Sequence, residues 1–260
     1  MRSTTAAAVA LASTLAVSAN AAAPVTAPPW LGVAMAEVGD KVVVRRVTRR
    51  SPADAAGIRA GDGLVRVGDK KLGGAVDVSG EIRRRKAGEQ VDVAVSREGT
   101  LQKTTAKLET VPGDSELLRR DVVGQKAPSL RPLSQVQGDV PEEVAGKVTV
   151  VVFFASWCVA CRAEAPTMNR WHDKFSALGV RVIGVGADGP YTASKVAEEL
   201  ELKFAVTADP ANLVSEAWQS SAVPTVYVVD KKGVIRNAVV GLDPPELRRA
   251  EAQLEKLAAE

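Results

Sequence analysis

The sequence has few of the residues that build metal centres. In 260 residues it contains two cysteines, Cys158 and Cys161, and one histidine, His172. A tetrahedral zinc site needs three or four such ligands, so a zinc site is poorly supported. We expect neither a metal nor another cofactor.

The sequence also lacks an excess of charge of either sign. It has 34 Lys and Arg residues against 31 Asp and Glu residues, which gives a net charge of +3. A balance this even gives no reason to expect nucleic acid or an anionic membrane as the main partner.

Long apolar runs are absent as well, because no stretch reaches the ~18 uninterrupted apolar residues of a membrane-spanning helix. At the start of the chain, Arg2 precedes a shorter apolar run from Ala6 to Val17, and small residues follow up to Ala23. This order is typical of a secretory signal peptide, which we place at residues 1–23. The alternative is an uncleaved membrane anchor. We therefore expect a periplasmic or secreted protein.

Composition divides the rest of the chain into two domains. Residues 24–29 are small and proline-rich, as in an extended linker. Residues 30–110 read as short strands and tight turns, which predicts a small β-rich domain. The expected elements are strands at 41–47, 64–67, 90–97 and 101–108 and a helix at 76–86. Proline and glycine after residue 110 break the pattern, so residues 111–121 are expected to be a second linker.

From residue 122 to residue 260, strand and helix patterns alternate. The expected strands are 148–154, 181–186, 204–207, 225–229 and 234–240, and the expected helices are 158–178, 192–200, 211–220 and 244–259. This alternation predicts an α/β domain whose sheet is covered by helices on both faces.

The two cysteines are separated by only two residues, in the stretch Ala155-Ser156-Trp157-Cys158-Val159-Ala160-Cys161. A structural disulfide that closes so short a loop adds little stability. The pair instead fits redox work. The buried strand 148–154 places Cys158 at the first turn of the next helix, where free amide groups lower the pKa of a thiol. We expect Cys158 to attack and Cys161 to resolve the mixed disulfide.

These residues belong to the motif Phe153-Phe154-Ala155-Ser156-Trp157-Cys158-x-x-Cys161-Arg162-x-Glu164-x-Pro166, which resembles the thioredoxin-fold thiol-disulfide oxidoreductases of the TlpA/ResA-like branch. Two further stretches, residues 124–128 and 222–233, are similar to that branch and follow in the same order. The resemblance implies a thioredoxin-like domain, with a central mixed sheet flanked by helices, over residues 122–260.

The same resemblance implies roles for further residues. Pro224 would be a cis-proline facing the cysteines, and Val223 would offer backbone groups to a bound substrate strand. Trp157 would cover one side of the thiols. Glu164 would be a partly buried carboxylate that moves a proton to or from Cys161. The alternative for Glu164 is a solvated helix residue paired with an arginine.

In the first domain, the stretch from Ser51 to Asp69 resembles the PDZ domains of exported bacterial proteases. The residues that match their carboxylate-binding loop are Trp30, Leu31, Gly32 and Val33. The resemblance implies a peptide that adds to the edge strand 33–37, with its terminal carboxylate held by the loop. Alternatively, the domain packs against a neighbouring domain or a second copy.

The leading hypothesis is an exported thiol-disulfide oxidoreductase that acts on protein substrates with cysteines or disulfides, while the PDZ domain recruits a partner. The uncharged dipeptide Val159-Ala160 favours a reductant over an oxidant, and a reductant would need a membrane electron donor. A PDZ-based scaffold with an incidental thioredoxin-like domain is the alternative. A thiol peroxidase is disfavoured because such enzymes usually place threonine and proline just ahead of the attacking cysteine, where this chain has Phe154-Ala155-Ser156-Trp157.

Overall fold

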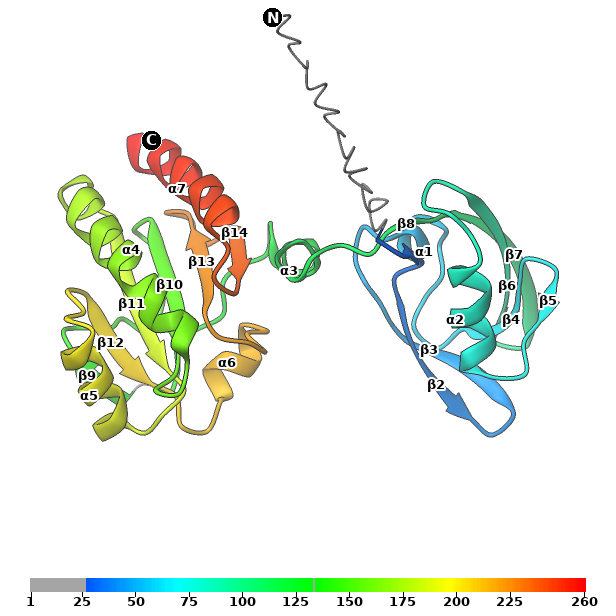
Figure 1. Cartoon of the computed structure of the whole chain (residues 1–260), viewed down its shortest axis with the longest axis horizontal. Helices are drawn as coiled ribbons and strands as arrows, with labels where there is room; N and C mark the ends of the chain where they lie inside the picture. Colours follow the sequence, from blue (N-terminus) through cyan, green and yellow to red (C-terminus); the bar gives the residue numbers. More distant parts are fainter. Residues whose placement is uncertain (1–26, 133) are drawn as a thin grey trace, which may run out of the picture.

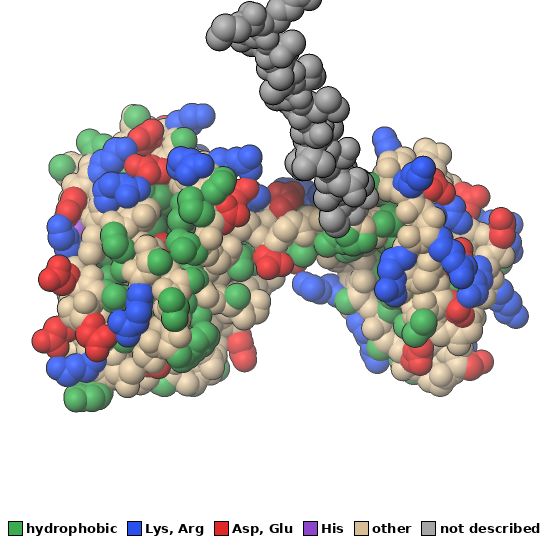
Figure 2. Space-filling view, in the orientation of Figure 1, with side chains coloured by type: hydrophobic (Ala, Val, Ile, Leu, Met, Phe, Trp, Pro, Cys, Tyr) green, Lys and Arg blue, Asp and Glu red, His purple; other side chains and the backbone are tan. Residues whose placement is uncertain are grey.

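The computed structural model describes residues 27–132 and 134–260, so the expected signal peptide lies outside the described residues. The chain forms two bodies, an amino-terminal one from β1 to β8 and a carboxy-terminal one from β9 to α7, with helix α3 between them (Figure 1). Within the described ranges, no helix combines the length and apolar character needed to cross a membrane. Acidic and basic side chains are interspersed over both bodies (Figure 2).

The amino-terminal body is a twisted antiparallel sheet with two short helices. Its main sheet has the order β2-β3-β4-β6-β7, with β5 paired to β4, and β1 pairs with β8 in a separate two-stranded ribbon. Its elements are β1 (Pro29–Trp30), β2 (Val33–Val38), β3 (Lys41–Val47), α1 (Pro52–Ala55), β4 (Gly63–Val67), β5 (Lys70–Lys71), α2 (Ala75–Arg83), β6 (Gln90–Arg97), β7 (Thr100–Lys107) and β8 (Glu109–Thr110).

Alternation along the strands explains the core of this body. Val42 and Val44 of β3 point inward and are buried, as are Val78 and Ile82 on one face of α2. Helix α1 begins after Ser51, whose hydroxyl accepts a hydrogen bond from the amide of Asp54 at 3.2 Å. The sequence therefore predicted these elements to within a few residues.

Two segments expected as linkers contain regular structure. Pro29 belongs to β1 and pairs with Thr110. Residues 111–121 contain most of helix α3 (Asp114–Val122), which carries acidic residues in its first turn and arginines in its last turn, as the helix dipole favours. The helix packs along strand β14, so the second linker is not an extended tether.

The carboxy-terminal body is a six-stranded mixed sheet with the order β14-β13-β10-β11-β12-β9. Strands β10, β11 and β12 are parallel, and the other three are antiparallel to their neighbours. Its elements are β9 (Ser134–Gln137), β10 (Thr149–Phe154), α4 (Val159–Phe175), the 3₁₀ turn η1 (Ser176–Leu178), β11 (Arg181–Gly186), α5 (Pro190–Glu199), β12 (Ala205–Ala208), α6 (Leu213–Ala217), β13 (Thr225–Val229), β14 (Ile235–Val240) and α7 (Pro244–Ala259).

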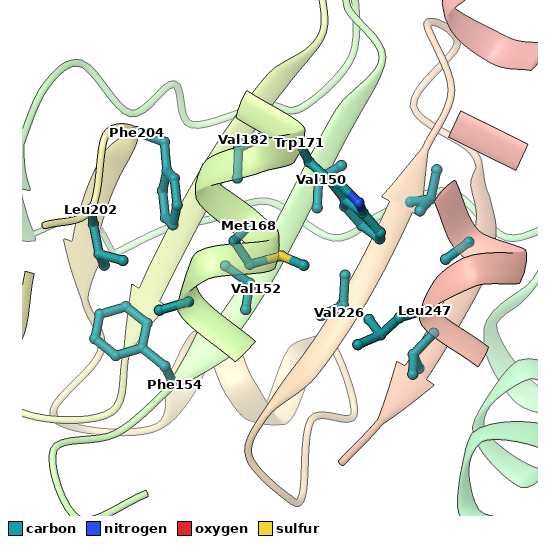
Figure 3. Packing of buried hydrophobic residues seen from close by; sticks show 14 of the residues in the cluster. Val150, Val152, Phe154, Met168, Trp171, Val182, Leu202, Phe204, Val226 and Leu247 are labelled. Atoms are coloured by element: carbon teal, nitrogen blue, oxygen red, sulfur yellow. The ribbon is translucent and has the colours of Figure 1, made fainter. Parts of the chain in front are cut away.

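Strand β10 lies inside the sheet, and every one of its residues is buried. Its alternate side chains face two separate cores. Val150 and Val152 pack with Met168 and Trp171 of α4, together with residues of α5 and α7 (Figure 3). On the other face, Phe153 packs with Trp218 and Tyr227, next to α6. Burial on both faces explains the uninterrupted apolar run of this strand.

The expectation of a mixed sheet flanked by helices is confirmed. Helix α6 is shorter than the expected span 211–220. Asn212 and Gln219 both have positive φ values, +56° and +57°, which a right-handed helix does not contain.

Candidate active site

The two cysteines lie where β10 ends and α4 begins, and a disulfide joins them. Cys158 is the N-cap residue of the 17-residue helix α4, and its sulfur accepts a hydrogen bond from the amide of Cys161 at 3.0 Å. The unpaired amides of a first helical turn stabilise negative charge. This position at the helix N-terminus, with Cys161 a turn deeper, is consistent with the expectation that Cys158 is the attacking residue.

The surface beside the cysteines is apolar. Cys158 and Cys161 are only 4% and 5% exposed, whereas their neighbours Trp157 and Val159 are 74% and 81% exposed. The Trp157 side chain therefore stands largely in solvent beside the disulfide. It offers a partner protein an aromatic contact surface next to Cys158.

Glu164 lies one turn after Cys161 on the same side of α4. Its side chain is 1% exposed, and neither carboxyl oxygen has a hydrogen-bond partner within the described part of the chain. Burial raises the pKa of Glu164 to about 8. The alternative of a solvated glutamate paired with an arginine is therefore wrong.

Pro224 precedes strand β13, and the Val223–Pro224 peptide bond is cis, as the resemblance implied. Thr225, the first residue of β13, pairs with Phe153 of β10, the strand that leads into the Cys158 loop. The Val223–Pro224 segment therefore lies at the same edge of the sheet as the disulfide. Val223 is half-buried and leaves part of its surface free.

The structure adds one residue that the sequence analysis did not identify. Asp188 follows β11, and its carboxylate accepts hydrogen bonds from the backbone amide and the hydroxyl of Ser156, at 2.7 Å and 2.8 Å. Strands β10 and β11 are parallel neighbours, so their carboxyl ends meet at one edge. The available signal in the sequence was an aspartate two residues after the end of a strand that is expected to lie next to β10.

Arg162 also contacts the loop before Cys158. Its guanidinium donates to the Ser156 carbonyl at 3.5 Å and pairs with Glu199 of α5 at 3.0 Å. It does not point at the disulfide, which agrees with a surface arginine.

In the amino-terminal body, the loop of Trp30, Leu31, Gly32 and Val33 joins β1 to β2. Gly32 has φ of +90°, and a side chain there would overlap Ser51. The carbonyls of Leu31 and Gly32 accept hydrogen bonds from Ala53 and Thr48, both at 2.9 Å. The structure assigns no acceptor within the described residues to the amides of Leu31 and Gly32. Such amides are what a carboxylate-binding loop requires.

Strand β2 follows this loop. Among the described strands it pairs only with β3, which makes it an edge strand of its sheet. Leu31 is buried in the core, and Val33 and Met35 pack against it with part of their surface free. Helix α2 lies close to β2, and the Glu37 carboxylate accepts a hydrogen bond from the Ala75 amide at 2.8 Å. The edge is therefore open to an added strand next to an apolar surface.

Comparison with known proteins agrees with this division. Residues 29–108 match the PDZ domain model, and residues 123–238 match the AhpC/TSA family model. The chain joins a PDZ domain to a thioredoxin-like domain.

Relatives of the thioredoxin-like domain share a name. Thiol-disulfide oxidoreductase ResA of Bacillus cereus is 28% identical over 138 residues, which cover 52% of this chain and 78% of that protein. ResA of Oceanobacillus iheyensis is 29% identical over 126 residues, 46% of this chain and 65% of its own length. Among solved structures, a putative thiol:disulfide interchange protein DsbE from Chlorobium tepidum is 26% identical and covers 52% of this chain and 98% of its own, with a TM-score of 0.45. The two ResA sequences relate the thioredoxin-like domain to thiol-disulfide oxidoreductases.

Proposed function

We propose that this protein exchanges disulfides with protein substrates through Cys158 and Cys161, and that it acts as a reductant outside the cytoplasm. The observation that carries the proposal is the Cys158–Cys161 disulfide at the amino end of α4, one helical turn from a buried, unpaired Glu164. The pair has the geometry for reversible chemistry at a surface that a partner protein can contact.

In the first step, the Cys158 thiolate attacks a substrate disulfide. A bond forms between the Cys158 sulfur and one substrate sulfur, and the other substrate sulfur leaves as a thiolate. The first turn of α4 supports this step because its amides stabilise the attacking anion, as the contact from the Cys161 amide illustrates.

In the second step, Cys161 must lose its proton before it attacks. Glu164 accepts this proton as a carboxylate, the Cys161 thiolate bonds to the Cys158 sulfur, and the substrate leaves as a second thiolate. A pKa of about 8 for Glu164 lies near that of a free thiol, so the proton passes between the two groups at little cost. The disulfide then needs two electrons and two protons from a donor, for which a membrane thiol donor is the proposed source.

Substrate binding in this proposal uses the surface around the disulfide. Trp157 is exposed next to Cys158 in the sequence, and the half-buried Val223 packs against the cluster that contains both cysteines. The backbone of Val223 is the proposed partner of an extended substrate strand. The uncharged Val159-Ala160 pair between the cysteines supports the reducing direction, because it adds no group that would strongly stabilise the thiolate form.

Trapping tests this proposal directly. With Cys161→Ala, substrates should remain bound to Cys158 as mixed disulfides that a reducing agent cleaves before electrophoresis, and Cys158→Ser should trap none.

Insulin reduction is a second test. Wild-type protein should reduce insulin in the presence of a slow chemical reductant, and Cys158→Ser should not. Insulin reduction that survives Cys158→Ser would contradict the proposal, and peroxide consumption without insulin reduction would favour a thiol peroxidase. Cell fractionation tests export.

We further propose that the PDZ domain recruits a partner by binding its carboxyl terminus. The support comes from the amides of Leu31 and Gly32 and from the edge of β2, for which the described residues supply no acceptor and no second paired strand. A fluorescent peptide with an apolar last residue and a free carboxylate should bind the full chain, and the amidated peptide should bind at least tenfold more weakly, as expected for loss of ~1.4 kcal/mol. Equal binding would contradict carboxylate capture. Peptide binding without any trapped substrate would favour the scaffold alternative.

A further inference from the structure

A cleft of about 1040 Å³ lies between the PDZ domain and the thioredoxin-like domain. Leu117 and Leu118 of α3 line it, with Trp30, Val33 and Ala34 on the PDZ side. The other side is formed by α6 and by the segment that leads to the cis peptide bond, including Ser221, Ala222 and Thr225. In Figure 2 the two domains are joined by a narrow waist, where α3 lies.

Helix α3 contacts both domains, and these contacts fix the positions of the two walls. Asp121 accepts hydrogen bonds from the Arg46 guanidinium at 3.3 Å and from the Arg49 amide at 3.4 Å. Arg120 donates to the Arg50 carbonyl at 2.9 Å, pairs with Glu109 at 2.8 Å, and lies 5.5 Å from the centre of the Trp30 ring. We call these contacts of Asp121 and Arg120 the α3 bracket.

On the other side, α3 is fixed to the edge of the thioredoxin-like sheet. The Ser115 hydroxyl accepts a hydrogen bond from the Val240 amide at 2.8 Å, and Arg119 pairs with Glu246 of α7 at 2.7 Å. The cleft is therefore a defined feature between two positioned walls.

The cleft borders the segment that contains the cis peptide bond, although the two cysteines and Trp157 do not line it. Ala222 and Thr225, which line it, flank the Val223–Pro224 bond, and the Thr225 hydroxyl donates to the Ala222 carbonyl at 2.6 Å. A substrate strand that runs past Val223 would therefore have the cleft beside it at Ala222, on the side of α3 and the PDZ domain.

Charge indicates what this cleft accepts. Three carboxylates line it, those of Asp114, Asp121 and Glu216, against the single guanidinium of Arg46, which already pairs with Asp121. Asp114 and Glu216 are exposed and have no ion-pair partner within the described residues. The excess negative charge attracts a positively charged segment and repels an acidic one.

We propose that this cleft binds the extended, basic segment next to the reacting cysteine of a protein substrate, so that both domains contact one substrate chain. The inference rests on the proposed disulfide exchange and adds a substrate preference to it. The PDZ domain contributes a wall of this substrate site, and Trp30 and Val33 in that wall also belong to the loop next to its own peptide groove.

Two peptide substrates test the proposal. They share a disulfide and differ only in carrying lysines or glutamates on both sides of it. The full-length wild-type protein should reduce the lysine peptide with a kcat/KM about tenfold higher, and the ratio of the two values should shrink as salt screens the charges. Glu216→Lys should lower this ratio to near one. Ala34→Lys should lower it as well, because exposed Ala34 lines the cleft from the other domain.

Because the two peptides are compared within one variant, the ratio of their kcat/KM values does not depend on a general effect of the substitution on the reactivity of the cysteines. The matched control is Glu143→Lys, because Glu143 is exposed and lies in the segment before the amino end of β10, opposite the redox edge. Its ratio should equal that of wild type. Equal rates for the two peptides in wild type, an unchanged ratio in Ala34→Lys, or the same loss in Glu143→Lys overturns the cleft proposal. Wild-type protein that fails to reduce even a small disulfide such as DTNB overturns the proposed function instead.

Discussion

At the scale of the residue, Glu164 is the group whose environment departs furthest from its usual one. A carboxyl with no hydrogen-bond partner, buried on the same helix face as Cys161, is costly to ionise, and its pKa rises to about 8. This free-energy cost of ionising Glu164 is acceptable where Glu164 exchanges a proton with a thiol of similar pKa. This burial therefore fits a chemical role better than a structural one.

The shifted pKa predicts how stability depends on pH. Between the ordinary value of 4.5 and about 8, the folded protein keeps a proton on Glu164 that the unfolded chain has released. Raising the pH through this window therefore lowers the free energy of unfolding, by up to about 1.4 kcal/mol per pH unit. Glu164→Gln should remove this contribution. Urea unfolding of the oxidised protein across the window measures it, with Glu143→Gln as the exposed control. Identical slopes in wild type and Glu164→Gln would sink the prediction.

Asp188 is a positioning residue in the same site, because it acts through Ser156 and not on sulfur. Asp188→Ala removes both acceptors and should slow insulin reduction by about tenfold, since small errors in placing a nucleophile are costly. Asp188→Asn keeps an acceptor for the Ser156 amide and should restore most of the rate. The pH profile of Cys158 alkylation in the reduced protein should stay the same in Asp188→Asn. If Asp188→Asn is as slow as Asp188→Ala, the rate depends on the negative charge of Asp188 and not on the hydrogen bond that it accepts from the Ser156 amide.

At the scale of the element, helices and strands with a strong local sequence pattern could be predicted, and those with a weak pattern could not. The apolar run of β10 and the cysteine motif after it fix the strand, the helix and the position of the thiols. Helix α3 escaped prediction because charged residues fill much of it and its contact with β14 depends on Ser115, a polar residue. Only the family resemblance implied a partly buried Glu164, and the residue pattern by itself did not, because a glutamate on a helix is usually solvated. The structure shows that its burial is nearly complete.

Helix α3 also protects the β14 edge of the sheet. The Ser115 hydroxyl bonds with the amide and the carbonyl of Val240, at 2.8 Å and 3.4 Å, and the side chain is almost fully buried. Ser115→Ala leaves both groups without this partner and should lower the free energy of unfolding by about 1–2 kcal/mol. The exposed Ser176→Ala is the control, with an expected change below about 0.5 kcal/mol. Denaturant unfolding with equal m-values measures both, and equal stabilities would contradict this role of Ser115.

At the scale of the whole molecule, each of the two domains can be recognised in the sequence. The contacts that join them cannot be predicted from it. Asp121 and Arg120 gave no signal in the sequence, because surface charges are common and, apart from Glu109, the residues with which they form hydrogen bonds across to the PDZ domain lie 70 to 75 residues away. We expect the α3 bracket to decide whether the PDZ domain moves freely on a tether or stays next to the thioredoxin-like domain.

The α3 bracket can be tested by its effect on shape separately from stability. Arg120→Ala removes the contacts to the Arg50 carbonyl, Glu109 and the Trp30 ring together. Partly exposed pairs contribute little to folding, so the free energy of unfolding should change by less than about 1 kcal/mol. The radius of gyration from small-angle scattering should nevertheless increase as the domains separate. Arg249→Ala, which removes one exposed pair with Glu246 on α7, should change neither quantity. A scattering curve for Arg120→Ala identical to that of wild type would show that the bracket does not hold the domains, and the lysine-peptide preference should then also be independent of Arg120.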